Sequence, residues 1–256
     1  MSSKSNDQGR AFEKACLVAL GEIIVKFRNY EKVVFEKNSS FEAATRAWNN
    51  TDGDFQDTIM KAARAMAKKL ADLEPIMIEN DDETIVLKIQ KDEEGEKGDV
   101  RDILIIRGES GWEIGLSVKH NHFAVKHSRL SPSIDFGKKW YDIPCSGTYW
   151  DAIIPIFNYL KSEKDNEVKW SDLPDKDDNV YIPLLNAFME EIKRANSVDP
   201  AFPRRMVEYL LGEYDFYKVI SIDSKKTTNI QSFNLRGTLN QASLTKKPNI
   251  DIPIAE

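Results

Sequence analysis

The residues best suited to chemistry gather around one predicted β-hairpin. All three histidines of the chain lie between positions 120 and 127, directly after the strand-like run 112–119. A second strand-like run, 102–107, precedes it, and the link 108–111 begins and ends with glycine. Short glycine-containing links of this kind join antiparallel strands. The sequence therefore predicts a hairpin whose open end carries polar and basic residues.

The register of this hairpin brings an aspartate and a lysine together. If Arg107 pairs with Trp112, Asp102 lies opposite Ser117 and diagonal to Lys119. Residues opposite or diagonal on one face of a sheet lie about 4.5–8 Å apart. A carboxylate there can bind a hard metal ion that also binds phosphate, and a neighbouring lysine can orient an attacking water. The hairpin is therefore the predicted site of metal-dependent phosphodiester cleavage.

Each of these residues also has a simpler interpretation. Asp102 could be a strand-edge carboxylate paired with Arg101, and Lys119 could be an ordinary exposed lysine at a strand end. Asp99 is a weaker ligand candidate because it falls in the loop that approaches the strand. Glu113 shares the face of Lys119, but at ~3.3 Å per residue it lies about 13 Å from the polar end of the hairpin, too far to share one metal ion.

The histidine cluster favours phosphate contacts over a separate catalytic motif. The string His120-Asn121-His122 has the letters of the HNH nuclease motif, but that motif needs a ββα metal unit with wider spacing, so the match is a coincidence. Histidines and basic residues beside a cleavage site suit contacts to phosphate groups. A structural role for any one histidine is equally open. The predicted DNA-contacting residues of this segment are His120, Asn121, His122, Lys126, His127 and Arg129.

The elements around the hairpin form an α/β pattern. Apolar spacing predicts helices over 9–26, 54–73, 150–160 (with Pro155 as a kink), 184–194 and 204–211, and a capping box at Ser39 predicts a short helix through Trp48. Strands are predicted at 76–78, 84–90, 102–107, 112–119 and 216–222, and the segment from Lys225 is polar with little periodicity. Helices, an antiparallel meander and then helices with a late strand predict an α/β domain with a mixed central sheet flanked by helices.

Composition limits the class of protein. Apolar residues make up 41% of the chain and charged residues 30%, which suits a folded domain. No apolar run approaches the ~18 residues of a membrane span, and the polar start has no signal-peptide core. Two cysteines, Cys16 and Cys145, argue against a disulfide framework and lack metal-ligand spacing. We therefore expect a cytoplasmic protein without a zinc site.

Charge is distributed unevenly along a chain whose formal net charge is -6. Residues 79–102 include ten acidic and four basic residues, whereas 113–140 include five basic and two acidic, and 218–247 include six basic and one acidic. Charge runs are often solvated faces. Two basic segments in an acidic protein nevertheless favour a local binding site for a polyanion such as nucleic acid.

Asp102 followed by Ser117-Val118-Lys119 resembles the core of the PD-(D/E)xK nucleases, in the variant in which serine replaces the acidic residue of the second strand. Nucleases of this variant generally take a carboxylate from a following segment, where Asp135 is the positional candidate. The string Gly9-Arg10-Ala11-Phe12-Glu13 resembles the start of their first helix, whose glutamate often points to the metal site. The resemblance implies Asp102, Ser117, Lys119, Asp135 and Glu13 as catalytic residues, and Asp102 with Asp135 or Glu13 as metal ligands.

A longer resemblance, from Gln8 to about Pro253, is to the HaeIII-like type II restriction endonucleases. It is strongest in 8–13, 98–107, 117–130, 134–140 and 207–212. It implies Mg²⁺-dependent, blunt cleavage of double-stranded DNA at GGCC, in the cytoplasm of a bacterium whose companion DNA methyltransferase protects the host DNA. The implied architecture is a single restriction endonuclease domain over 1–256, with a nuclease core at about 8–160 and C-terminal helices and a basic recognition segment at about 180–256.

The polar segment 229–240 is the predicted reader of DNA sequence. It offers amides, a guanidinium group and hydroxyls without carboxylates, and such groups can bind base edges in the major groove. An ordinary polar loop is the alternative. The predicted contacts of this segment are Asn229, Gln231, Asn234, Arg236 and Asn240, while Lys138 and Lys139 suit phosphate contacts, which position a duplex without reading it. A palindromic target suggests a homodimer, although a monomer could act twice.

Two other functions fit the same residues. A repair or recombination nuclease with this core would act on DNA structure instead of sequence, and discrete fragments from one plasmid would exclude it. A non-catalytic DNA-binding protein would be consistent with Ser117 and would bind DNA without cutting it, whatever metal is supplied.

Overall fold

The computed structural model describes residues 2–96, 98–126, 128–243, 248 and 250. The chain divides into two compact units, one of Met1–Lys126 with Leu211–Ile250 and one of His127–Leu210 with Asp251–Glu256. The first unit contains the sheet and the predicted hairpin, and the second is helical. The single domain over 1–256, with the internal boundaries given above, stays a prediction.

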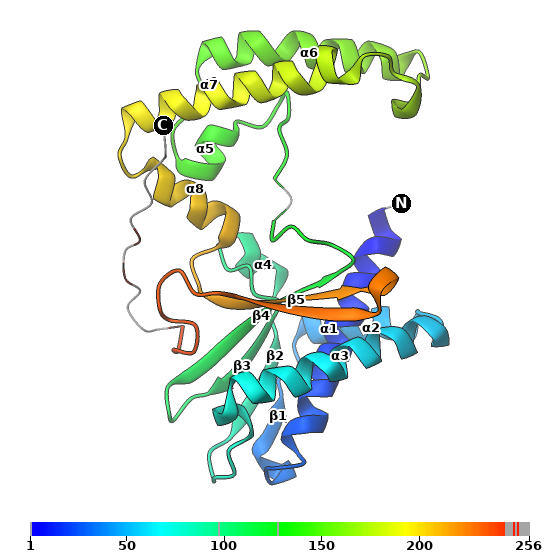
Figure 1. Ribbon diagram of the computed structural model, residues 1–256, viewed down its shortest axis with the longest axis vertical. Coiled ribbons are helices and arrows are strands. Elements are labelled where there is room, and N and C mark those ends of the chain that lie inside the picture. The colour runs from blue at the N-terminus through cyan, green and yellow to red at the C-terminus, as the bar shows by residue number, and fades with distance from the viewer. Residues whose placement is uncertain (1, 97, 127, 244–247, 249, 251–256) are drawn as a thin grey trace. The chain divides into compact units, whose positions relative to one another are not determined.

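The first unit is built on a six-stranded sheet with the order β1-β2-β3-β4-β5-β6 (Figure 1). Its strands are β1 (Val33–Phe35), β2 (Ile85–Ile89), β3 (Ile103–Arg107), β4 (Trp112–His120), β5 (Phe216–Ile222) and β6 (Thr227–Phe233). The pairs β1–β2 and β4–β5 are parallel and the other neighbouring pairs are antiparallel. The predicted α/β class with a mixed central sheet is therefore confirmed.

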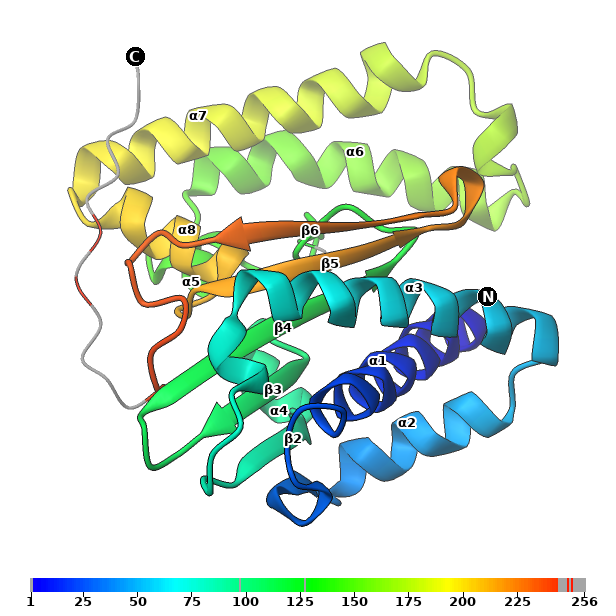
Figure 2. The same cartoon turned by 60° about the horizontal axis from the view of Figure 1, so that its bottom comes forward.

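Long helices cover one face of this sheet, as Figure 2 shows for α1 and α3. These helices are α1 (Ser2–Ile24), α2 (Ser39–Asn49) and α3 (Gly53–Leu73), and a short helix, α4 (Asp92–Glu96), joins β2 to β3. Their apolar side chains share one core with alternate strand residues such as Ile105 and Leu116. Since side chains alternate along a strand, Ser117 and Lys119 belong to the other face.

Side-chain caps explain where two of these helices begin. The side chain of Asn38 accepts the N–H of Phe41 at 2.9 Å, so α2 is capped by Asn38 and the capping box predicted from Ser39 was wrong. The side chain of Asp52 accepts the N–H of Phe55 at 2.8 Å at the start of α3. Asparagine and aspartate suit this position because their oxygens satisfy amide groups that the first turn leaves free.

Two predictions of strands failed for local reasons. The predicted strand 76–78 is a 3₁₀ helix, Pro75–Ile78, and proline suits its first turn because the missing N–H would have no partner there. The segment after Lys225, predicted to lack periodicity, contains β6, in which Ile230 packs against the core while Gln231 is exposed. The apolar residues of β6 do not alternate regularly with polar ones, so the sequence pattern of this edge strand is weak.

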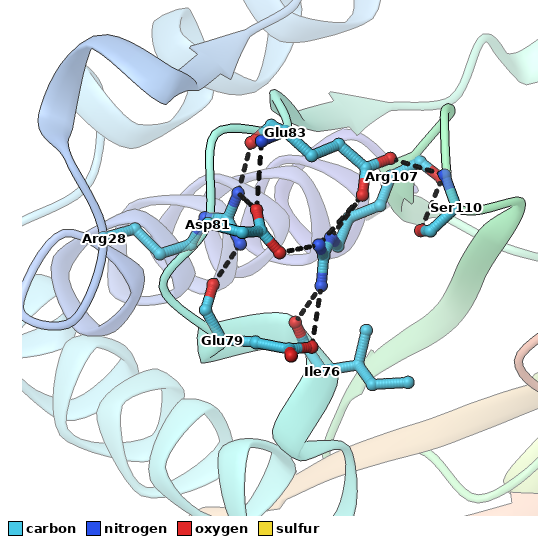
Figure 3. A network of polar contacts seen from close by, with 7 residues as sticks. All are labelled: Arg28, Ile76, Glu79, Asp81, Glu83, Arg107 and Ser110. Carbon is cyan, nitrogen blue, oxygen red and sulfur yellow. Dashed lines mark hydrogen bonds and ion pairs between the residues drawn. The ribbon is translucent and has the colours of Figure 1, made fainter.

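Two buried arginines, Arg28 and Arg107, form a polar network at the end of the hairpin that carries the β3–β4 turn. Arg107, the last residue of β3, binds Glu83 at 2.9 Å and also contacts Asp81, which Arg28 binds at 2.7 Å (Figure 3). Glu83 also accepts the N–H of Ser110 in the turn at 2.8 Å. These bonds join the turn after α1, the loop before β2 and the β3–β4 turn into one network.

The second unit contains helices α5 (Phe136–Tyr141), α6 (Gly147–Asp165) and α7 (Ile182–Val198), with a 3₁₀ helix (Trp170–Asp172) and a π-helix (Asp177–Tyr181) between α6 and α7. Helix α8 (Phe202–Leu211) ends where the chain returns to the first unit. The core of the second unit is aromatic: the ring of Phe136 lies 5.0 Å from those of Trp140 and Tyr149, in edge-to-face arrangements that aromatic pairs favour. Pro155 lies inside α6. Among the described residues of the chain, no helix is long and apolar enough to cross a membrane.

Candidate active site

The β3–β4 hairpin has the register expected from its sequence. Arg107 pairs with Trp112, and at the other end of β3 the N–H of Asp102 donates to the carbonyl of Leu116 at 2.7 Å. Continuing the observed pairing by one step places Asp102 opposite Ser117. The prediction that these two residues face one another is confirmed.

The carboxylate of Asp102 is held by three neighbours on β4. Its Oδ2 accepts hydrogen bonds from the N–H of Val118 at 2.6 Å, from Nζ of Lys119 at 3.0 Å and from Oγ of Ser117 at 3.4 Å. The alternative in which Asp102 pairs with Arg101 was wrong, because Arg101 binds other carboxylates. A half-buried aspartate and lysine in direct contact, as predicted, can act together on one phosphate group.

Glu13 supplies a second carboxylate to the same place. It lies on α1, and with Asp102 and Lys119 it lines a cavity of about 270 Å³, hereafter the Asp102 cavity. Burial, and next the negative charge of Asp102, raise the pKa of Glu13 to about 8, although Lys119 and Arg10 act in the opposite direction. Two neighbouring carboxylates that repel each other mark a place where an added cation would be stabilising.

The oxygen ligands of this cavity fit a magnesium ion. Mg²⁺ prefers carboxylate oxygens, keeps several waters, and is usually bound by one or two carboxylates together with phosphate. Asp102 and Glu13 provide two such groups. This set therefore matches an open magnesium site better than a closed structural one.

Asp135, the other predicted ligand, has a structural task in the second unit. It caps α5, and its carboxylate accepts the N–H groups of Lys138 at 2.9 Å and Cys145 at 3.1 Å. Although burial opposes the charged form, these bonds lower the pKa of Asp135. Its role as a metal ligand stays a prediction. Of the two candidates, Glu13 is the one that shares the cavity with Asp102.

A buried arginine forms part of the cavity wall beside Asp102. Arg101 binds both oxygens of Asp99, at 2.8 and 2.7 Å, and Glu113 at 2.7 Å. Its stem lies over Gly115, where an added Cβ would stand 2.0 Å from the Cδ of Arg101. The carboxylates of Asp99 and Glu113 are thus paired with an arginine.

His120 and Asn121 are held by contacts within the protein. The side chain of His120 is only 8% exposed and its Nε2 lies 2.8 Å from Oδ2 of Asp223. Its ring also meets those of Phe12 and Phe55 edge to face. The side-chain amide N–H of Asn121 donates to Oδ2 of Asp223 at 3.0 Å, and its Oδ1 accepts the backbone N–H of Asp223 at 2.9 Å. This arrangement favours a structural role for His120, while its predicted DNA contact stays a prediction.

The other predicted phosphate contacts fall in different parts of the molecule. Lys126 lines the Asp102 cavity, and His122 is partly buried in the segment before it. Arg129, Lys138 and Lys139 are exposed side chains of the second unit, and Lys138 pairs with Asp142. His127 lies outside the described residues. Lys126 is therefore the predicted basic contact that the structure brings to Asp102.

The predicted recognition segment begins as strand β6. Asn229, Gln231 and Asn234 are exposed and border a groove of about 770 Å³ together with Lys69 and Tyr217. Asn240 is exposed beyond the strand, whereas Arg236 is only 7% exposed. A base-reading side chain must reach a groove of DNA, so the exposed amides suit that role better than Arg236, whose contact with DNA stays a prediction.

One residue of this face was missed by the sequence reasoning. Lys218 lies on β5 as the pairing partner of Ser117 on one side and of Gln231 on the other. It is buried, and its ammonium group donates to the carbonyl of Phe123. The available signal in the sequence was a lysine inside a strand rich in β-branched residues. The residues that lie beside Lys218 on β4 and β6 could be named only once the strand order was known.

Comparison with known proteins identifies the family of this chain. The sequence pattern of the HaeIII restriction endonuclease family matches residues 9–256. The type II restriction enzyme HaeIII of Haemophilus aegyptius is 50% identical over 256 residues, which is 100% of this chain and 79% of that enzyme. No solved structure matches. Because the match extends over nearly all of the chain, including α1 and the hairpin that form the Asp102 cavity, the protein belongs to the HaeIII restriction endonuclease family.

Proposed function

We propose that this restriction endonuclease cuts both strands of DNA at GGCC, leaving blunt ends, at a Mg²⁺ site in the Asp102 cavity. The observation that carries the proposal is the contact of Lys119 with Asp102 at 3.0 Å beside a second carboxylate, Glu13. The proposed target follows from the 50% identity with the HaeIII enzyme over the full chain. The substrate would be double-stranded DNA whose backbone enters the cavity.

Each residue of the cavity has a separate task in this proposal. Asp102 and Glu13 would hold Mg²⁺ through carboxylate oxygens. When bound, the ion supplies a Lewis acid and lowers the pKa of a coordinated water. Lys119 orients the attacking water with its ammonium group and stabilises the negative charge that grows on the phosphate. Ser117 donates to Asp102 and keeps its carboxylate in place.

The sheet itself connects the cleavage site to the proposed base contacts. Gln231 and Asn229 of β6 pair with β5 residues whose other neighbours are Ser117 and Lys119, so all four side chains share one face. An amide can donate to guanine O6 or N7 and accept from the cytosine amino group, the groups that GGCC presents in the major groove. Lys126 would bind phosphate, which fixes the position of the duplex.

The proposed activity also suggests an oligomeric state, a companion enzyme and a cellular location. A palindromic target suits a two-fold arrangement of two chains, so we propose a homodimer on DNA. A DNA methyltransferase that modifies the same sequence would protect the host genome without needing contact with this protein. Cys16 and Cys145 are both free and buried, as expected for a cytoplasmic protein of a bacterium.

Digestion of a fully sequenced plasmid, with and without Mg²⁺, tests this proposal. We expect the unchanged protein to leave blunt ends at every GGCC in the presence of Mg²⁺. The Asp102→Asn variant should make no cuts. Cuts confined to another short sequence would contradict the proposed target. A retained gel shift without cuts under any divalent metal would contradict cleavage itself.

A further inference from the structure

Lys218 stands in the same cross-strand row as Asp102 and Ser117 of the proposed active site. Its pairing partner on β4 is Ser117 and its partner on β6 is Gln231. Since Ser117 lies opposite Asp102, the row runs Asp102, Ser117, Lys218, Gln231 across four strands. Neighbouring strands are about 4.8 Å apart, so the backbone of Lys218 stands about 10 Å from that of Asp102.

The environment of Lys218 is unusual for a lysine. Its residue surface is only 3% exposed, whereas lysine is almost never buried without a partner. Its Nζ donates a hydrogen bond to the carbonyl of Phe123. Burial, and next the positive charge of Lys119, lower the pKa of Lys218. Because burial removes water from this ammonium group, its hydrogen bond to the carbonyl of Phe123 offsets part of the cost of burying it.

That contact fixes the middle of a strap, residues 121–126, which follows β4. At the start of the strap Asn121 adopts a left-handed conformation with φ 53° and binds Asp223. At its end Lys126 lines the Asp102 cavity. The strap is thus attached at its first residue by Asn121 and at its third by Lys218, and its last residue stands beside the proposed metal site.

We propose that Lys218 is a positioning residue for DNA cleavage, which holds the carbonyl of Phe123 so that the strap presents the ammonium group of Lys126 to the phosphate in the Asp102 cavity. This inference rests on the proposed function and adds to it a residue that acts without touching DNA. Misplacement of a reacting group by about 1 Å, caused by a distant change, can cost about 10²-fold in rate.

A double-mutant cycle separates a positioning role from an independent one. We expect Lys218→Met to lower the single-turnover rate at saturating DNA by about 10- to 10²-fold, and Lys126→Met to lower it at least as much. Residues that act through one another give non-additive effects, so the double variant should cleave no more slowly than Lys126→Met. Effects that multiply in the double variant would overturn the proposal.

Two further variants serve as a rescue and as a control for this cycle. Lys218→Arg keeps a donor and a positive charge, and we expect it to recover part of the rate lost in Lys218→Met. Lys61→Met removes an exposed lysine of α3 that belongs to none of the proposed sites, and it should cleave like the unchanged protein. If Lys218→Met does not fold, Lys218→Arg can replace it in the cycle. Any loss of cleavage rate that the arginine causes by displacing the strap should disappear when Lys126 is already replaced in Lys126→Met.

Limited trypsin digestion gives a readout that does not depend on cleavage of DNA. Trypsin cuts after Lys126, and proteolysis requires local opening of the chain, so Lys218→Met should be cut there faster than Lys61→Met at equal thermal stability. Equal rates would contradict the attachment of the strap by Lys218. An Asp102→Asn variant that still cleaves DNA would instead refute the proposed function, and the trypsin result would be unaffected.

Discussion

Asp102 and Lys119 are seventeen positions apart in the chain, and a hydrogen bond of 3.0 Å joins their side chains because the hairpin makes them diagonal neighbours. The same aspartate accepts the backbone N–H of Val118 at 2.6 Å. One oxygen of Asp102 is thus fixed by the strand that carries the lysine. A change at Lys119 therefore affects the chemistry at Asp102 while the backbone bond that positions Asp102 is kept.

Lys119→Met tests this division of tasks. We expect the substitution to lower the cleavage rate by about 10²–10⁴-fold, the range found when a positioned proton-transfer or charge-stabilising group is lost. Folding and specific DNA binding should change little, because the β4 backbone keeps its bonds to β3. Rapid-quench cleavage and a gel shift without Mg²⁺ measure the two effects. A variant that cleaves at the normal rate would remove Lys119 from the mechanism.

The second acidic ligand is decided by a matched pair of substitutions. Glu13 shares the cavity with Asp102, whereas Asp135 caps α5. Glu13→Gln should therefore raise the Mg²⁺ concentration needed for half-maximal cleavage at least tenfold, which corresponds to about 1.4 kcal/mol. Asp135→Asn keeps a capping side chain, so we expect it to leave the Mg²⁺ requirement unchanged.

Calorimetric titration of each variant with Mg²⁺ checks the same point without DNA. Weaker binding in Glu13→Gln alone supports Glu13 as the ligand. The reverse result, with Asp135→Asn weakened and Glu13→Gln normal, would assign the second carboxylate to Asp135 and restore the expectation drawn from its position in the sequence.

At the scale of elements, the sequence predicts what is local and repeated. The hairpin register followed from a short glycine link and two β-rich runs, and this correctly placed Asp102 opposite Ser117. The long helices followed from apolar spacing. Strand β6 could not be predicted because its two apolar residues, Ile230 and Phe233, are three positions apart among polar residues and do not alternate. A propensity for pairing with β5 is not visible in residues 227–233 alone.

The site shows the same limit. The pairing of Asp102 with Lys119 depends on contacts within one hairpin, which sequence patterns can predict. The burial of Lys218 and its bond to Phe123 depend on β5 lying beside β4, a parallel pairing of segments about a hundred residues apart. Similarly, Asp135 was favoured by its order in the chain, and only its bonds to backbone N–H groups reveal a capping role. Contacts that depend on pairing between distant segments of the chain therefore could not be predicted from the sequence.

Gly115 provides a test of how elements position the aspartate. Its missing Cβ leaves room for Arg101, the residue before Asp102, which is tied to Asp99 and Glu113. Gly115→Ala should push the arginine aside, lower the free energy of unfolding by about 1–3 kcal/mol and slow cleavage without altering any charge.

Gly108→Ala is the matched control, because nothing lies within 4 Å of the Cβ that it would add. Urea unfolding and single-turnover cleavage of both variants give the comparison. If Gly115→Ala lost stability but cleaved DNA at the normal rate, Arg101 would stabilise the sheet without positioning Asp102.

At the scale of the whole molecule, the stability of the fold should depend on pH through the network around Arg107. Burial opposes the charge of Glu83, but hydrogen bonds from Ser110 and the positive charge of Arg107 lower the pKa of Glu83 below its ordinary value of 4.5. Burial likewise opposes the charge of Asp81, and its bond with Arg28 lowers the pKa of Asp81 below 3.8. Both groups are therefore held ionised by contacts that join distant parts of the chain.

The sign of the effect follows from these lowered pKa values. A carboxylate whose pKa is lower in the folded state binds fewer protons there than in the unfolded state, so its stabilising contribution is complete above the unfolded value and is lost as pH falls. We expect the free energy of unfolding to decrease from about pH 5 downward. Glu83→Gln should lower it by about 1.5–3 kcal/mol at pH 7, the contribution of a hydrogen bond to a charged group.

The decisive comparison is the slope of stability against pH. Because Glu83→Gln removes one of the groups that must take up a proton, its free energy of unfolding should fall less steeply between pH 5 and pH 3 than that of the unchanged protein. Glu109→Gln, which neutralises an exposed glutamate in the β3–β4 turn, should keep the original slope. Equal slopes in all three proteins would show that acid unfolding begins elsewhere, and that the arginine network holds the hairpin without linking its stability to pH.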